Sequence, residues 1–282
     1  MCYDCNVSEK ISPSEIFEWR IRQHSHGLAN RVCQAGGGEL LLTMLELFVT
    51  ETEKNTGKIV FSAGLAGTMQ ALGYYTTLYK PIQTGAAVTK DNLLKSRDLE
   101  FMKYVDSYME TFSTYLFKSD SSPIIAAALE GVEIDVDLIY QDYMTFSRNF
   151  ECIVTDGTMG LSTPITRKFL EADLVKNLSL PVVLVAPAES SSINNTIMAI
   201  QQAQNSGVSL RGVVLSTSAG LVDEESVTIK LIQEYTGVRV CGIFNKLKDE
   251  FEVNPNDVIA NIITDVDIQY LFNIEIAKLK SC

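Results

Sequence analysis

The run Leu180-Pro-Val-Val-Leu-Val185 constrains the fold of this chain most strongly, because none of its side chains is polar. A strand that is apolar on both faces is typical of the centre of a parallel sheet that helices cover on each side. Further short apolar runs precede and follow it, and segments with helical periodicity separate them. This alternation predicts an α/β fold with three layers, in which helices cover both faces of a mostly parallel central sheet.

The expected elements begin at Leu45. We expect strands at residues 45–50, 75–79, 152–154, 180–185, 210–215 and 238–244. We expect helices at residues 58–72, 90–110, 123–129, 135–150, 224–235 and 258–280, and another helix that opens after the polar turn at 188–194. The first helix carries Ala63, Ala66, Gly67 and Ala71, and these small residues predict close packing on the sheet.

Composition limits the classes of function that the chain can serve. It has 282 residues, of which 46% are hydrophobic, and a net charge of −12. The hydrophobic share is normal for a soluble globular protein, and the acidic balance argues against a nucleic-acid partner, since phosphate backbones require a basic surface. No apolar run is long enough for a membrane span, and the N-terminus lacks the charged-then-apolar layout of a secretory signal. We therefore expect a cytoplasmic protein.

Residues 1–43 differ in composition from the rest, and we expect them to be an extension of a domain formed by residues 44–282. Enough ligands for a zinc ion occur in this extension, namely Cys2, Cys5, His24, His26 and Cys33. Their spacing fits no standard zinc motif, so a tail without metal is the alternative. Met44 lies directly before the first expected strand, which raises the further hypothesis that the natural chain starts there.

The segment from Phe48 to Val60 predicts a strand, a polar turn and a helix that begins at Gly57-Lys58. Free N–H groups and the positive end of the helix dipole converge at such a helix start, and Lys58 adds a full positive charge. This is the physical basis of a phosphate-binding loop. A glycine of the usual motif is replaced by Glu51, and the Ser or Thr that holds magnesium is replaced by Ile59. The alternative is a strand, turn and helix with an exposed lysine.

Polar clusters follow the expected strands, at residues 54–58, 80–84, 156–158, 190–194 and 216–218. In an open parallel sheet, ligands bind outside the carboxyl ends of the strands. We therefore expect these clusters to form one site.

Several motifs together resemble the dethiobiotin synthetases. These motifs are Phe48-Val-Thr50 with Thr52 and Gly57-Lys58, Tyr79-Lys-Pro-Ile-Gln-Thr-Gly85, Ser122-Pro123 with Glu130-Gly131, Asp156-Gly157 with Gly160 and Thr163-Pro164, and Leu180–Val185 leading to Ile193-Asn194. They occur in the order and spacing of that family from about Leu45 to Leu247. The segment Tyr-Lys-Pro-x-x-Thr-Gly is fairly specific, whereas neighbouring P-loop ligases and partitioning ATPases share the first motif only. The resemblance implies a P-loop NTPase-like fold.

The resemblance also implies a reaction, its cofactors and a homodimer. A diaminononanoate takes up carbon dioxide as a carbamate, whose oxygen attacks the γ-phosphate of ATP to give a mixed anhydride. The second amine then closes a cyclic urea and expels phosphate. Such chemistry needs magnesium and positive charge on the phosphates and on the carbamate, and it needs no histidine. Both histidines of the chain, His24 and His26, precede the expected domain.

The resemblance assigns roles by position. The nucleotide would contact Thr52, Lys54, Asn55, Thr56, Gly57, Lys58, Ile59 and Ser216. The substrate would contact Lys80, Thr84, Gly157, Ser191, Ser192, Ile193 and Asn194. The last four would bind the substrate carboxylate, and in the family they belong to the partner subunit of the dimer. Lys58 and Lys80 would be catalytic, and Asp98 and Asp156 would hold magnesium. The alternatives are a surface lysine for Lys80, a surface acid for Asp98, a turn residue for Asp156 and a simple helix cap for residues 190–192.

The departures from the family pattern leave more than one function open. Glu51 adds negative charge beside the phosphates, Ile59 removes a hydroxyl, and Ser216 stands where the family has an Asn that contacts adenine. One interpretation is an active synthetase. The others are an impaired or regulatory descendant with the same fold, and a related ATP-dependent ligase or ATPase with another substrate.

Overall fold

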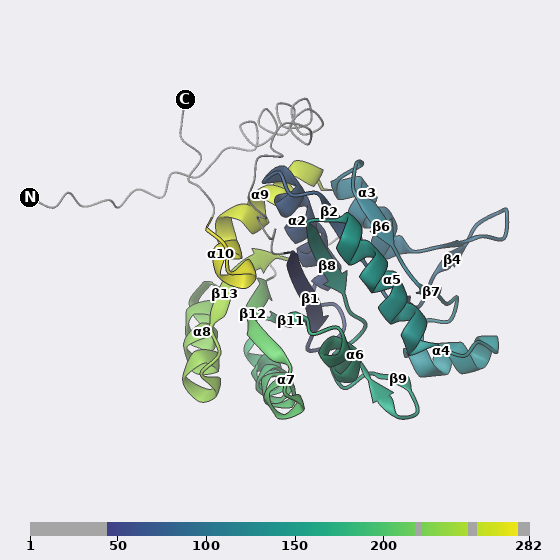
Figure 1. Ribbon diagram of the computed structural model, residues 1–282. Helices are drawn as coiled ribbons and strands as arrows, with labels where there is room; N and C mark the ends of the chain where they lie inside the picture. Colours follow the sequence, from purple (N-terminus) through teal and green to yellow (C-terminus); the bar gives the residue numbers. More distant parts are fainter. Residues whose placement is uncertain (1–43, 218–221, 248–252, 276–282) are drawn as a thin grey trace, which may run out of the picture.

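The computed structural model describes residues 44–217, 222–247 and 253–275 (Figure 1). Its centre is a seven-stranded sheet with the strand order β13-β12-β11-β1-β8-β2-β6. Every neighbouring pair in this sheet is parallel, which confirms the α/β fold class. The strands are β1 (Leu45–Glu51), β2 (Thr76–Tyr79), β6 (Glu110–Phe112), β8 (Cys152–Asp156), β11 (Pro181–Pro187), β12 (Ser209–Thr217) and β13 (Val240–Asn245).

Three short strand pairs lie outside the main sheet. They are β3 (Ile82–Gln83) with β7 (Tyr115–Leu116), β4 (Ala87–Val88) with β5 (Leu94–Lys95), and β9 (Pro164–Thr166) with β10 (Phe169–Leu170). The helices are α2 (Lys58–Ala71), α3 (Arg97–Val105), α4 (Pro123–Glu130), α5 (Val136–Asn149), α6 (Glu171–Asn177), α7 (Ile193–Ser206), α8 (Val222–Thr236), α9 (Pro255–Asp265) and α10 (Ile268–Phe272). A 3₁₀ turn at Ser190–Ser192 leads into α7. No helix among the described residues has both the length and the hydropathy required to cross a membrane.

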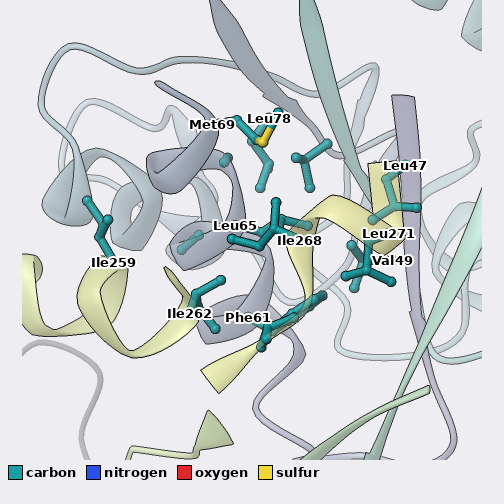
Figure 2. Close-up of a cluster of buried hydrophobic side chains, with 14 of the residues drawn as sticks. Leu47, Val49, Phe61, Leu65, Met69, Leu78, Ile259, Ile262, Ile268 and Leu271 are labelled. Carbon is teal, nitrogen blue, oxygen red and sulfur yellow. The ribbon is translucent and has the colours of Figure 1, made fainter. Parts of the chain in front are cut away.

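The helices form two layers, one on each face of the sheet. Successive side chains of β1 point to opposite faces of the sheet. Leu47 and Val49 pack on one face with helices α2, α3, α9 and α10. Phe48 packs on the other face with helices α4, α5, α6 and α7. Figure 2 shows the first of these clusters, where Phe61 and Leu65 of α2 meet Ile262 of α9. Helix α8 packs on the second face through Ile232. The chain therefore has the three layers that its sequence predicts.

The small residues of α2 allow this helix to pack closely against both the sheet and helix α9. A Cβ atom on Gly64 would lie 2.5 Å from Ile262 Cγ1, and one on Gly67 would lie 2.9 Å from Ile259 Cδ1. The expected close packing of Gly67 therefore occurs against α9, while Ala63 and Ala66 pack in the core between α2 and the sheet.

Two predicted helices were wrong in extent. A helix over residues 90–110 was expected, but α3 spans only Arg97–Val105, because Ser96 caps its first turn by accepting from the Leu99 N–H. The strands β5 and β6 occupy the two ends of the expected segment. The expected helix over 258–280 is divided between α9 and α10 by Val266, which forms an antiparallel bridge with Gly242. Residues 276–282 lie outside the described part of the chain.

The proposals for residues 1–43, including the zinc ligands Cys2, Cys5, His24, His26 and Cys33, also lie outside the described residues. The extension and a start at Met44 stay predictions.

Candidate functional site

The carboxyl ends of three neighbouring strands build the centre of the site. Strand β8 lies between β1 and β2 in the sheet. The loop after β1 leads to Lys58, the residue after β2 is Lys80, and Asp156 ends β8. Because the three strands are parallel, their ends place these side chains at one edge of the sheet.

Both lysines bind Asp156. The Lys58 ammonium lies 2.9 Å from each carboxylate oxygen of Asp156 and also donates to the Gly157 carbonyl at 2.7 Å. The Lys80 ammonium lies 2.5 Å from Asp156 Oδ2 and 2.8 Å from Oδ2 of Asp98, a residue in the first turn of α3. Four predicted site residues, Lys58, Lys80, Asp98 and Asp156, therefore form one ion network.

Burial strengthens the electrostatic coupling within this network. Asp156 is fully buried, and the side chains of Lys58 and Lys80 are about as inaccessible. Burial alone would raise the pKa of Asp156, but the ammonium groups of Lys58 and Lys80 lower it to about 2. Burial likewise opposes the charge on Lys80, yet the carboxylates of Asp156 and Asp98 raise its pKa above the ordinary range. Lys80 and Asp156 are therefore charged at neutral pH.

The loop between β1 and α2 contains two residues in the left-handed conformation. Gly57 precedes α2 with φ at 79°, a left-handed conformation that favours glycine, and Asn55 has φ at 65°. Thr56 is buried and donates its hydroxyl to Glu51 Oε2 at 2.7 Å, while Lys54 is exposed. The predicted strand, turn and helix start are thus confirmed.

The two departures from the phosphate-loop motif have different surroundings. The side chain of Ile59 is half-buried and packs against the core between α2 and the sheet. Glu51 is half-buried, and burial raises the pKa of its carboxyl group despite the nearby charge of Lys58. Ile59 therefore brings an apolar side chain to this position, and Glu51 brings a carboxylate to the loop.

Three buried hydroxyl groups near this edge of the sheet lack partners among the described residues; one is Thr155 Oγ1, and the other two belong to predicted nucleotide residues. Thr52 Oγ1, directly after β1, and Ser216 Oγ, near the end of β12, have no hydrogen-bond partner among the described residues. An unpaired buried polar atom costs free energy unless a ligand satisfies it. Both positions were predicted to contact the nucleotide, and their unsatisfied hydroxyls fit a polar ligand that lies across these strand ends.

Beside the loop after β8 lies a cavity of about 330 Å³, whose wall includes Glu51, Thr52, Met159, Leu161, Leu184 and Gln202. A second cavity of about 370 Å³ lies between α2, β13 and α9, where Asn245 and Asp257 are among its lining residues. Neither wall includes Lys58, Lys80 or Asp156. Half of the lining residues of the first cavity belong to the segment that follows Asp156.

The remaining predicted substrate residues relate differently to the ion network. Gly157 is buried and joins it through the carbonyl that accepts from Lys58. Thr84 is half-buried, and its carbonyl accepts from the Gln83 amide at 2.5 Å. Ser191 and Asn194 are exposed at the start of α7, and Ile193 is half-buried there. No hydrogen bond or ion pair within the described ranges joins Thr84, Ser191 or Ser216 to Lys58, Lys80 or Asp156.

The structure identifies three polar residues that the sequence patterns did not reveal. Ser62, one turn after Lys58 on α2, donates to Asp156 Oδ1 at 2.8 Å. Glu53 accepts from Ser192 Oγ at 3.0 Å and from the Asn195 amide at 2.5 Å, which connects the loop after β1 to the start of α7. Glu171 is buried behind the loop after β8. Of the three, only Ser62 could have been predicted from the sequence, because it lies four residues after Lys58 and residues i and i+4 share one face of a helix.

The residues fit a magnesium ion in their donor chemistry. Magnesium takes oxygen ligands and usually one or two carboxylates beside substrate phosphates and water. Asp98 and Asp156 supply two such carboxylates, and both contact the same lysine ammonium. Among the described residues no group of three or more His, Cys, Asp or Glu side chains is placed to hold a metal. A site completed by phosphate oxygens is consistent with both facts.

Comparison with known proteins agrees with this geometry. The AAA domain family matches residues 46–250. The ATP-dependent dethiobiotin synthetase BioD of Bacillus subtilis (strain 168) is 25% identical over 235 residues, which cover 82% of this chain and 98% of that protein. The enzyme of the same name from Anoxybacillus flavithermus is 29% identical over 203 residues, which cover 71% and 90%. The chain is thus similar to dethiobiotin synthetases along most of their length.

A solved structure with a similar fold is the MinC:MinD cell division protein complex of Aquifex aeolicus. Its TM-score is 0.52 at 14% identity, and the match covers 84% of this chain and 100% of that one. At this identity the similarity concerns the fold alone, and the P-loop NTPase-like architecture predicted from the sequence is confirmed.

Proposed function

We propose, since the chain belongs to the AAA domain family, that it is an ATP- and magnesium-dependent dethiobiotin synthetase. It would close the ureido ring of 7,8-diaminononanoate with carbon dioxide, as a step of biotin biosynthesis. The observation that carries this proposal is the convergence of Lys58 and Lys80 on Asp156, with Asp98 paired to Lys80. Two buried ammonium groups at the end of a parallel sheet are suited to phosphoryl transfer, which depends on positioning and on stabilisation of negative charge.

Each residue has a distinct task in this proposal. Lys58 would exchange its contacts with Asp156 for the phosphates of ATP. Lys80 would stabilise the carbamate and the phosphoryl group that it receives, with Thr84 donating to the carbamate. Asp98 and Asp156 would hold the magnesium ion, which when bound neutralises charge on the phosphate oxygens. Thr52 and Ser216 would use their unpaired hydroxyls on the nucleotide.

The reaction balances without any further reactant. One substrate amine bonds to carbon dioxide and loses a proton, and an oxygen of the resulting carbamate displaces ADP from the γ-phosphate. The second amine then attacks the carbamoyl carbon, the C–O bond to phosphate breaks, and a second proton leaves. The substrate carboxylate would bind residues 191–194 of a partner subunit, at the start of α7, where the positive end of the helix dipole favours an anion.

A second candidate function is an impaired or regulatory protein with the same fold. The observation that favours it is the pairing of Glu51 with Thr56 inside the phosphate loop, together with the burial of Ile59 against the core. Glu51 would repel the phosphates, and the loop would lack a hydroxyl for magnesium. A third candidate, a related ligase or ATPase with another substrate, remains open on the same fold.

The deciding experiment measures phosphate release from ATP with magnesium and bicarbonate, with and without diaminononanoate. We expect release that depends on diaminononanoate and that is lost in Lys80→Ala. Lys95→Ala is the matched control, because Lys95 is an exposed lysine of the same region that pairs with Glu100. Phosphate release at the same rate with and without diaminononanoate would support a related ATPase. A folded wild-type protein that binds no ATP would support the impaired protein.

A further inference from the structure

Glu171 is a buried carboxylate that the proposed reaction does not use. Its side chain is 1% exposed at the start of α6. Glu171 Oε1 accepts from Thr50 Oγ1 at 2.9 Å, and Oε2 accepts from the Thr158 N–H at 2.6 Å and also from the Thr158 hydroxyl. One carboxylate therefore joins the end of β1 to the loop that follows Asp156.

The peptide between Glu171 and the ion network is closely packed against Phe48 and Glu171. A Cβ atom on Gly157 would lie 2.6 Å from Phe48 Cε1 and 2.9 Å from Glu171 Oε1. The Gly157 N–H donates to the Val49 carbonyl at 2.8 Å. The carbonyl of the same residue accepts from Lys58 Nζ at 2.7 Å. Any shift of this peptide would therefore displace an acceptor of the Lys58 ammonium.

The start of α6 is itself attached to this loop. The Glu171 N–H donates to the Thr163 carbonyl, and the Ala172 N–H donates to the Leu161 carbonyl, each at 2.9 Å. The side chain and the main chain of Glu171 thus hold the loop at two separate places. Residues 157–163 are fixed between β1 and α6 by these bonds.

A role in stability alone does not explain a carboxylate at this position. Burying a charged group costs free energy, and an apolar side chain would fill the space without that cost. The pKa of Glu171 is raised by burial, against the opposing effect of its hydrogen bonds to Thr158 and Thr50. Burial of this carboxylate therefore costs free energy of folding, and its hydrogen bonds hold Thr158 and Gly157 in place.

We propose that Glu171 is a positioning residue of the nucleotide site, which fixes the Gly157–Thr158 peptide and through it the orientation of the Lys58 ammonium. This inference rests on the proposed function only in that Lys58 binds the phosphates of ATP. It assigns Glu171 no contact with ATP or with the substrate.

The test compares Glu171→Leu, Glu171→Gln and Asp173→Asn in the full chain. Leu fills the space but accepts no hydrogen bond. Gln can accept from the Thr158 N–H with its oxygen and donate to the Thr50 hydroxyl with its nitrogen, so it can keep the geometry without the charge. Asp173 lies on the same helix and accepts only from the Leu170 N–H and Lys176 among the described residues, so its variant controls for a weakened start of α6.

Two measurements need no turnover. Calorimetry with ATP and magnesium should show binding about tenfold weaker in Glu171→Leu, and nearly unchanged in Glu171→Gln and Asp173→Asn. Hydrogen exchange should show faster exchange of the Thr158 amide in Glu171→Leu only. If Glu171→Leu does not fold, Thr50→Val removes one donor to the carboxylate and should weaken ATP binding about threefold.

The inference is overturned if Glu171→Leu, or Thr50→Val in its place, binds ATP like the wild type. It is equally overturned if Asp173→Asn weakens ATP binding as much as Glu171→Leu does. The proposed function alone fails if the wild type binds ATP but releases no phosphate in response to diaminononanoate. A folded wild type that binds no ATP would overturn both the proposed function and this inference.

Discussion

The Ser62 hydroxyl donates a 2.8 Å hydrogen bond to Asp156 Oδ1, and both side chains are fully buried. Ser62 lies one helical turn after Lys58, so one face of α2 supplies two of the donors that hold this carboxylate. Asp156 replaces a longer Glu of the family pattern, and its shorter side chain lies within reach of Ser62. The orientation of the proposed magnesium ligand therefore depends on a serine as well as on two lysines.

Replacing Ser62 by Ala should weaken the response to magnesium more than it weakens the fold. Without the hydroxyl, one oxygen of Asp156 loses a donor and the carboxylate can rotate toward the lysines. We expect the magnesium concentration for half-maximal ATP binding to rise about tenfold, which corresponds to about 1.4 kcal/mol. Calorimetric titrations with ATP at a series of magnesium concentrations measure this directly.

Thr68→Ala is the matched control for Ser62. Thr68 is on the same helix and equally buried, but its hydroxyl contacts the Ile259 carbonyl at 3.4 Å, far from the network. We expect Thr68→Ala to lower the free energy of unfolding without changing the magnesium dependence of ATP binding. Equal magnesium responses in the two variants would contradict a role of Ser62 in orienting Asp156.

Neutralising Glu51 should strengthen nucleotide binding. Its carboxylate lies in the phosphate loop, bonded to Thr56, and would face the negative charge of ATP. Gln keeps the size and the acceptor for Thr56 while removing the charge. We expect Glu51→Gln to bind ATP about tenfold more tightly, measured by calorimetry at low ionic strength.

Glu46→Gln controls for the charge change in Glu51→Gln. Glu46 is on the same strand, and burial also raises the pKa of its carboxyl group, but it bonds to Tyr143 at the other end of β1. ATP affinity should not change in this variant. Weaker ATP binding by Glu51→Gln would show instead that the carboxylate supports the loop.

The pH dependence of stability should show a maximum in mildly acidic solution. Burial raises the pKa of Glu46, Glu51 and Glu171 above 4.5. Between pH 4.5 and the raised pKa values, the folded state therefore binds more protons than the unfolded state. The free energy of unfolding falls as pH rises through this range. The pKa of Asp156 is lowered from 3.8 to about 2, so its contribution is present above 3.8 and is lost as pH falls toward 2.

Urea unfolding between pH 3 and pH 8 measures this profile. Glu51→Gln should reduce the decline on the alkaline side, and Asp156→Asn should reduce the loss below pH 4. A free energy of unfolding that rises steadily from pH 4 to pH 8 would be incompatible with the buried carboxylates described above.

The sequence predicts the parallel sheet and the network residues because both have local signals. The run Leu180–Val185 is apolar on both faces, and Gly57-Lys58 follows an apolar strand directly. Lys80 and Asp156 each come at or just after the end of a strand, so their convergence follows from the topology of a parallel sheet. These features need no knowledge of distant contacts.

The parts that the sequence does not predict depend on tertiary contacts. Glu171 has the pattern of an ordinary acid in the first turn of a helix, and only the fold brings Thr50 and Thr158 to it. The edge strand β6 has no apolar run of its own and forms because β2 offers a pairing edge. Glu53 is charged in a polar loop, and its contact with Ser192 spans most of the domain in sequence.

Replacing Ile59 by Thr should separate the active from the impaired protein. Thr would restore a hydroxyl beside Lys58, at the position where the family pattern has a magnesium ligand. Ile59 packs against the core, so the loss of apolar contact should cost about 1 kcal/mol of stability. We expect phosphate release that depends on diaminononanoate to rise about tenfold, which corresponds to about 1.4 kcal/mol of transition-state stabilisation.

Val60→Thr supplies the control for Ile59→Thr, because Val60 is the next residue of α2 and is buried in the core. It should lose stability without any gain in rate, since a hydroxyl at residue 60 would face the core. A gain confined to Ile59→Thr would mean that the wild type is a working synthetase slowed by one missing ligand. No release in either folded variant would mean that Ile59 is not the obstacle, and Glu51 would remain as the cause of an impaired site.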